Sequence, residues 1–112
     1  MNTILHQKTY ILYTQLAKHV ARFPKLERYG LGLKLDGACL QLLEQIITAE
    51  QTAPVLKDKA LLEASVKTEL IKVLLRLCAE QKLIKETNYF SWSANLVEIG
   101  KMIGGWKKSL RV

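Results

Sequence analysis

Histidine, cysteine and serine are the side chains that most often carry catalysis in small proteins, and this sequence offers few useful combinations of them. His6 and His19 are the only histidines, and both fall in one predicted helix. Neither lies three residues after a glutamate, which is the spacing that di-iron sites use in helical bundles. No serine has a histidine in its own predicted segment. We therefore interpret His6 and His19 as surface or boundary residues.

The two cysteines, Cys39 and Cys78, lie on separate apolar stretches and form neither a C-x-x-C pair nor a metal-ligand spacing. This arrangement is typical of buried free thiols in a reducing compartment. The sequence also contains no phosphate-binding loop of the form G-x-x-x-x-G-K-[ST]. It thus predicts no enzyme active site, no metal site and no cofactor.

Positive charge is the chemistry that this sequence does provide. Its 112 residues include 17 Lys and Arg against 10 Asp and Glu, which gives a net charge of +7. Such an excess favours polyanionic partners: nucleic acid first, then an acidic protein, then an anionic membrane surface. A solvated basic surface without any partner is the alternative.

Binding to nucleic acid would be through its phosphates, because no motif for reading bases and no alternation of aromatic and basic residues is present. The predicted nucleic-acid-binding residues are Lys18, Arg22, Lys25, Arg28, Lys72, Arg76 and Lys108.

Residues 99–109, which read I-G-K-M-I-G-G-W-K-K-S, combine three glycines with a helical apolar pattern. A glycine costs about 1 kcal/mol relative to alanine inside a helix. We therefore expect Gly104 and Gly105 to permit close packing near Trp106, beside the cationic end formed by Lys107 and Lys108.

Four helices position these residues. Apolar residues recur every three or four positions, no alternating strand pattern is present, and Pro24, Pro54 and Asn88 divide the chain. The predicted helices span residues 3–22, 25–51, 55–84 and 89–108. Short connections between long helices imply antiparallel neighbours, so we predict one domain over residues 1–112, an all-α, up-down-up-down four-helix bundle.

Each predicted helix carries an apolar stripe that we assign to the core. The expected core residues are Leu5, Leu12, Leu16 and Val20; Leu31, Leu35, Ala38, Leu42, Ile46 and Ala49; Leu62, Val66, Leu70, Val73 and Leu77; and Trp92, Leu96, Ile99, Ile103 and Trp106.

Several helices carry a second apolar stripe as well. Such stripes either widen the core or form an interface between subunits, and we favour a homo-oligomer because large exposed apolar patches are rare on monomers. The predicted interface residues are Leu33, Leu40, Ile47, Leu61, Ile71 and Leu75.

Location follows from what the sequence lacks. No run approaches the ~18 uncharged apolar residues of a membrane-spanning helix. Residues 1–10 have no continuous apolar region of the kind found in secretory signals. We expect a cytoplasmic protein without membrane contact.

Two segments resemble a known family. Residues 23–31, F-P-K-L-E-R-Y-G-L, are similar to the entry into the second helix of small bacterial four-helix-bundle proteins. Residues 99–109 resemble the C-terminal G-x-M-x-G-G-W-x-K-S element of one branch, the accessory variability determinant of diversity-generating retroelements. The broader family includes proteins encoded in intervening sequences of large ribosomal RNA genes.

The resemblance to the retroelement branch implies a basic, barrel-like pentamer of four-helix bundles without catalytic residues. Such a pentamer would bind a dedicated reverse transcriptase and nucleic acid, either template-repeat RNA or its cDNA, during mutagenic retrohoming. The alternative is a structural or interaction bundle of the ribosomal intervening-sequence type with no retroelement role. A neighbouring reverse-transcriptase gene with template and variable repeats would decide between them.

Overall fold

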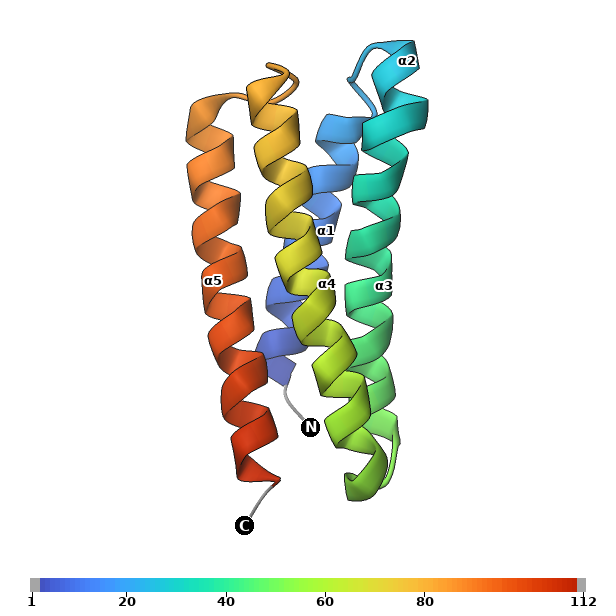
Figure 1. Cartoon of the computed structure of the whole chain (residues 1–112), viewed down its shortest axis with the longest axis vertical. Helices are drawn as coiled ribbons and strands as arrows, with labels where there is room; N and C mark the ends of the chain where they lie inside the picture. Colours follow the sequence, from blue (N-terminus) through green and yellow to red (C-terminus); the bar gives the residue numbers. More distant parts are fainter. Residues whose placement is uncertain (1–2, 111–112) are drawn as a thin grey trace.

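Four long antiparallel helices form the protein in a computed structural model that describes residues 3–110 (Figure 1). They are α1 (Thr3–Val20), α3 (Leu33–Gln51), α4 (Pro54–Glu80) and α5 (Glu86–Ser109). The bundle is 47 Å long, and no strand occurs in the described range. The predicted all-α, up-down-up-down four-helix bundle is therefore confirmed.

We call the end of the bundle where α1 and α4 finish the upper end, as it is drawn in Figure 1. There, residues 21–24 lead from α1 into the second helical stretch, and residues 81–85 connect α4 to α5. The lower end holds the connection between α3 and α4 together with the last turn of α5.

The predicted helix over residues 25–51 exists, but it contains an irregular turn. It begins with α2 (Lys25–Glu27), passes through a π-helical turn, η1 (Arg28–Gly32), and continues as α3. The residues at each junction keep right-handed helical φ and ψ angles, so the helical path is continuous. A π-helical turn inserts an extra residue into the helix, and its last residue here, Gly32, packs against Val20 at the end of α1.

The buried residues of α1, α3 and α5 are largely those of the predicted core stripes, but α4 buries the face opposite to the predicted one. The side chains of Leu62, Val66, Leu70, Val73 and Leu77 are exposed, so their assignment to the core was wrong. The buried residues of α4 are Ala60, Leu61, Ala64, Thr68, Ile71, Leu74, Leu75 and Cys78.

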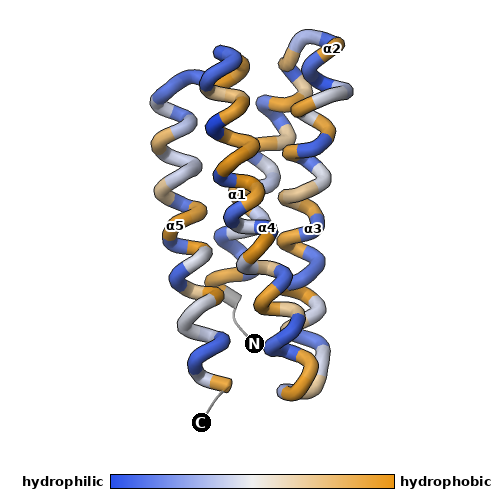
Figure 2. Tube along the Cα trace, in the orientation of Figure 1, coloured by the Kyte–Doolittle hydropathy of each residue, from blue (hydrophilic) through white to orange (hydrophobic). Residues whose placement is uncertain are grey.

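Periodicity could not choose between the two faces of α4, because both are apolar along the whole helix. Apolar residues recur along every helix of the bundle (Figure 2). The inward face differs in having the small residues Ala60 and Ala64 and the buried Thr68, whose hydroxyl donates a hydrogen bond to the Ala64 carbonyl at 2.8 Å. Small side chains on this face let α4 pack close to its neighbours.

α4 ends four residues before the predicted boundary. Lys82 has a φ of 60°, and the Leu83 N–H donates to the Cys78 carbonyl at 2.9 Å. The Lys82 N–H donates to the Ala79 carbonyl at 3.0 Å. These two bonds form a Schellman motif, which satisfies carbonyls that the helix end leaves unpaired. As a result residues 81–85 form a connection, and Ile84 is buried within it.

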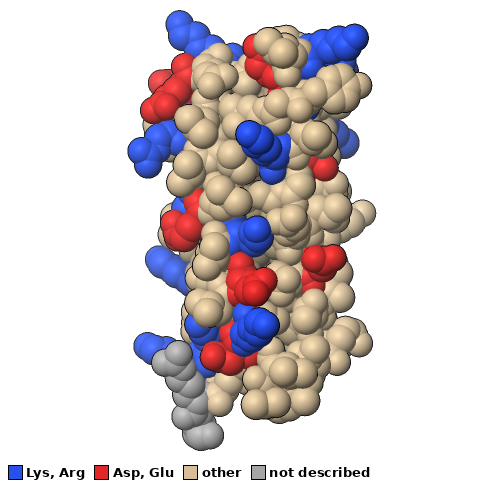
Figure 3. Space-filling model, turned by 45° about the vertical axis from the view of Figure 1, so that its right-hand side comes forward, with Lys and Arg blue, Asp and Glu red and all other residues tan. Residues whose placement is uncertain are grey.

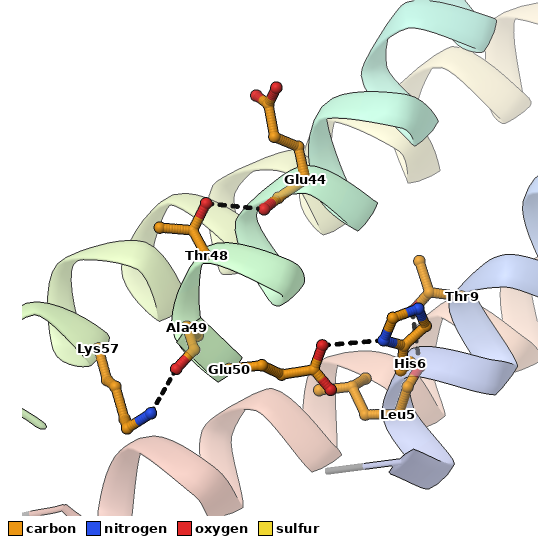
Figure 4. A network of polar contacts seen from close by, with 8 residues as sticks. All are labelled: Leu5, His6, Thr9, Glu44, Thr48, Ala49, Glu50 and Lys57. Carbon is orange, nitrogen blue, oxygen red and sulfur yellow. Dashed lines mark hydrogen bonds and ion pairs between the residues drawn. The ribbon is translucent and has the colours of Figure 1, made fainter. Parts of the chain in front are cut away.

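A group of polar contacts ties the helices together at the lower end (Figure 4). His6 Nδ1 of α1 lies 2.8 Å from Glu50 Oε1 of α3, and the Glu50 side chain is only 4% exposed. The Lys57 ammonium of α4 donates to the Ala49 carbonyl at 2.6 Å, which satisfies an acceptor in the last turn of α3. His6 is half-buried, as expected for a boundary histidine.

The glycines near the C-terminus do not pack closely within the bundle. Gly104 and Gly105 are exposed, and a Cβ on either would meet nothing within 4 Å, so the predicted close approach there is wrong for the single chain. The tight glycine is Gly32, where a Cβ would lie 2.9 Å from Val20 Cγ1 and 3.2 Å from the Glu27 carbonyl oxygen.

Alanine at Gly32 and at Gly104 should therefore have opposite effects. Gly32→Ala forces the end of α1 away from η1, and we expect it to destabilise the fold by ~1–3 kcal/mol. Gly104→Ala adds a methyl in open space and should stabilise the fold by ~0.5–1 kcal/mol through helix propensity. Chemical denaturation of both variants measures these changes, and a loss of stability in Gly104→Ala would contradict the open site.

Candidate nucleic-acid interface

The excess positive charge is concentrated at the two ends of the bundle. Between them, the middle of the helices carries six cationic residues and five carboxylates, so it is nearly neutral. The upper end carries six cations, Lys18, Arg22, Lys25, Arg28, Lys82 and Lys85, against three carboxylates, Glu27, Glu80 and Glu86. The lower end carries Lys57, Lys59, Lys107 and Lys108 against Glu50 and Asp58.

Figure 3 shows one side of this distribution. Lys and Arg side chains project at both corners of the upper end, with Asp or Glu side chains beside them, and charges of both signs are scattered over the neutral surface below. A polyanion would therefore meet net positive charge chiefly at the ends of the molecule.

The seven predicted nucleic-acid-binding residues do not form one patch. Lys18, Arg22, Lys25 and Arg28 are brought together at the upper end, and Arg76 lies one turn below the end of α4. Lys108 is in the last turn of α5, at the opposite end of the bundle.

Two of the predicted residues are engaged within the chain. The Lys72 ammonium lies 3.0 Å from Glu69 Oε1, an ion pair along α4. The Arg28 guanidinium lies 5.5 Å from the centre of the Tyr29 ring, and its Nη1 donates to the Ala21 carbonyl at 3.5 Å. Arg28 thus connects η1 to the end of α1 and contributes to structure as well as to charge.

Lys82 and Lys85 are basic residues that were not among the predicted nucleic-acid-binding residues. The predicted helix over residues 55–84 included Lys82 and ended just before Lys85, whereas both residues lie in the connection between α4 and α5 and line one pocket with Arg22. The three side chains line a pocket of about 330 Å³ at the upper end. Positions 81–85 carry no glycine or proline that would have marked the helix end.

The predicted interface residues divide into two groups. Leu33, Leu40 and Ile47, spaced seven residues apart on α3, are exposed. Leu61, Ile71 and Leu75 are fully buried in the core of the single chain, so their assignment to a subunit interface was wrong. They occupy the inward face of α4, whose outward face carries the exposed stripe instead.

We call the exposed apolar residues of these two helices the α3–α4 face. Its members are Leu33, Leu40 and Ile47 of α3 and Leu62, Val66, Leu70, Val73 and Leu77 of α4. A shallow groove of about 310 Å³ lies between the two helices, and its lining includes Gly37 of α3 and Leu70 of α4 but none of Leu33, Leu40 and Ile47. α5 adds Phe90 and Val97, which are exposed and lie on one side of that helix with Gly104.

Neither thiol is suited to act as a nucleophile. Both cysteines are free and buried, as predicted. Burial, together with the charge of Asp36, raises the pKa of Cys39 to about 12, and burial raises the pKa of Cys78 to about 11. Because the thiolate is the reactive form, both groups are inert near neutral pH.

Residues 3–110 contain no group of three or more His, Cys, Asp or Glu side chains that could hold a metal ion. None of the helices in this range has the length and hydropathy needed to cross a membrane.

Comparison with known proteins places the chain in a family. A search of curated proteins found no match. A family model described as bAvd-like matches residues 3–110, which is nearly the whole chain and agrees with the resemblance carried by residues 23–31 and 99–109. The chain belongs to the bAvd-like family.

Proposed function

We propose that this chain is a non-enzymatic accessory protein of a diversity-generating retroelement. It would assemble into a homo-oligomer, most simply a pentamer, and bind a reverse transcriptase together with RNA or DNA. Membership of the bAvd-like family is the observation that carries this proposal. The reverse transcriptase as partner rests on that membership alone, and a neighbouring reverse-transcriptase gene with template and variable repeats would support it.

The α3–α4 face supports assembly. Leu40 is 51% exposed and Val73 is 50% exposed, although both are large apolar side chains on regular helices. An extended apolar surface of this kind costs free energy in water and is typical of a protein–protein interface. The exposed apolar residues of α3 recur every seven positions, a spacing that favours packing against another helix along its length.

The charged ends support nucleic-acid binding. Lys and Arg outnumber Asp and Glu there, so phosphate groups are the expected ligands. Oligomerisation would repeat these ends around the assembly, which raises avidity without any new type of contact. The cations carry no base-reading geometry, so little discrimination between sequences is expected.

Assembly is tested by placing charge on the α3–α4 face. The unmodified protein should have a mass several times the 12.7 kDa of one chain in multi-angle light scattering. Leu40→Glu combined with Val73→Glu should yield single chains that remain helical, because both residues point away from the core. Their carboxylates would be desolvated without a partner at the interface.

Ile11→Glu provides the matched control. Ile11 is an equally exposed apolar residue, but it lies on α1, outside the α3–α4 face. We expect this variant to keep the mass of the unmodified protein. A mass of 12.7 kDa for the unmodified protein would refute assembly.

Phosphate binding is tested by salt titration with several unrelated oligonucleotides. The logarithm of the affinity should fall linearly with the logarithm of salt concentration, with a slope of roughly −0.7 to −0.9 per phosphate contacted. Arg22→Gln combined with Lys25→Gln should weaken binding to all sequences about equally and make the slope less steep. Arg28 is left unchanged because it also connects η1 to α1.

The control removes the same charge from the middle of the bundle. Lys67→Gln combined with Lys101→Gln should weaken binding less than the pair at the upper end does. Affinity that does not depend on salt, or no binding at low salt, would eliminate nucleic-acid binding through phosphates. The alternative function, a structural or interaction bundle, would then remain.

A further inference from the structure

The upper-end pocket has the chemistry of an anion site. Arg22 contributes one cation from the connection after α1, and Lys82 and Lys85 contribute two from the connection before α5. No Asp or Glu lines the pocket, and none of these three cations forms an ion pair with another described residue. Three cationic residues therefore line one small volume, and no acidic residue lines it with them.

The wall of the pocket is held in place by hydrogen bonds. His19 Nδ1 lies 3.0 Å from the Gln15 carbonyl oxygen, and His19 Nε2 lies 3.2 Å from Asn88 Nδ2. Since the carbonyl can only accept, Nδ1 donates to it, and Nε2 accepts from the Asn88 amide. The imidazole also packs edge-on against Trp92, with ring centres 4.7 Å apart. The Asn88 amide has a second N–H, which could donate a hydrogen bond to a ligand in the pocket.

Lys82 occupies a backbone position that glycine prefers. Its φ of 60° lies in the left-handed region, at the residue of the Schellman motif where glycine is the usual occupant. A lysine there costs stability relative to glycine. The chain thus carries a cation at the pocket in place of the residue that would best stabilise the end of α4.

The size of the pocket restricts the ligand. About 330 Å³ is near the lower limit of small-molecule sites. Internal phosphodiesters of a long strand can contact the exposed cations from outside, whereas a group at the end of a strand can enter the space between the two connections. A terminal phosphate carries a charge of about −1.5 to −2 at neutral pH, against −1 for a phosphodiester, and so suits three cations better.

We propose that the upper-end pocket binds a phosphomonoester. The group can be supplied by the phosphorylated end of a nucleic-acid strand or by a free mononucleotide, and only the first source depends on the proposed function. Arg22, Lys82 and Lys85 would pair with the phosphate oxygens, and Asn88 would donate a hydrogen bond to one of them.

The test compares short single strands of one sequence that carry a 5′-phosphate, a 3′-phosphate or hydroxyls at both ends. One of the phosphorylated strands should bind the unmodified protein about tenfold more tightly than the hydroxyl strand, the effect of roughly one charge-assisted hydrogen bond. A parallel calorimetric titration with adenosine 5′-monophosphate measures the free mononucleotide.

Lys82→Gly is the decisive variant, because it removes a pocket cation while relieving the left-handed backbone. It should melt at a higher temperature than the unmodified protein and yet lose most of the preference for the phosphorylated end. Loss of the preference therefore cannot come from unfolding. Lys67→Gln with Lys101→Gln, in the middle of the bundle, should lower affinity for all three strands alike and keep the preference.

The outcomes separate the pocket from the proposed function. Equal affinity for all three strands, together with no binding of the mononucleotide, overturns the pocket even if nucleic acid binds. Binding of the mononucleotide that Lys82→Gly abolishes, with no binding of any strand, supports the pocket and overturns nucleic acid as its source. A preference that Lys82→Gly leaves intact places the phosphate elsewhere and overturns the proposal.

Discussion

Each helix of a four-helix bundle can bury only one of its faces, and the rest of this structure depends on that constraint. α4 has apolar residues on two opposite faces, and only one of them can face the core. The face with Ala60 and Ala64 is turned inward, which leaves Val66 and Val73 in water. A lone chain would have to keep this apolar surface exposed. Contact with another chain would remove that cost, which is why we propose this face as the site of assembly.

Much of the fold could be predicted from the sequence, because helix boundaries and most core stripes depend on local signals. Phe23 and Pro24 mark the break after α1, and Pro54 begins α4. The inward face of α4 could not be predicted, because the apolar period is the same on both sides and the choice depends on packing against α3 and α5. The end of α4 was also missed, since Lys82 adopts a conformation for which its residue type gives no signal.

The candidate site was less predictable than the fold. A list of basic residues does not show which of them are opposed by carboxylates in space, and the middle of the bundle is nearly neutral even though it carries six cations. Lys82 and Lys85 meet Arg22 only because two connections distant in sequence close the same end of the bundle. Close packing was predicted at Gly104, but this residue is exposed and lies on the same outer side of α5 as Val97.

Assembly and nucleic-acid binding are linked in this view, since the apolar faces would bring together cationic ends that are individually weak. The most direct test measures the affinity of the Leu40→Glu, Val73→Glu variant for an oligonucleotide long enough to reach several subunits. All basic residues are intact in this variant. At equal chain concentration and low salt, we expect it to bind at least tenfold more weakly than the unmodified assembly, as loss of avidity requires. A folded single-chain variant that binds as tightly as the unmodified protein would contradict the central claim.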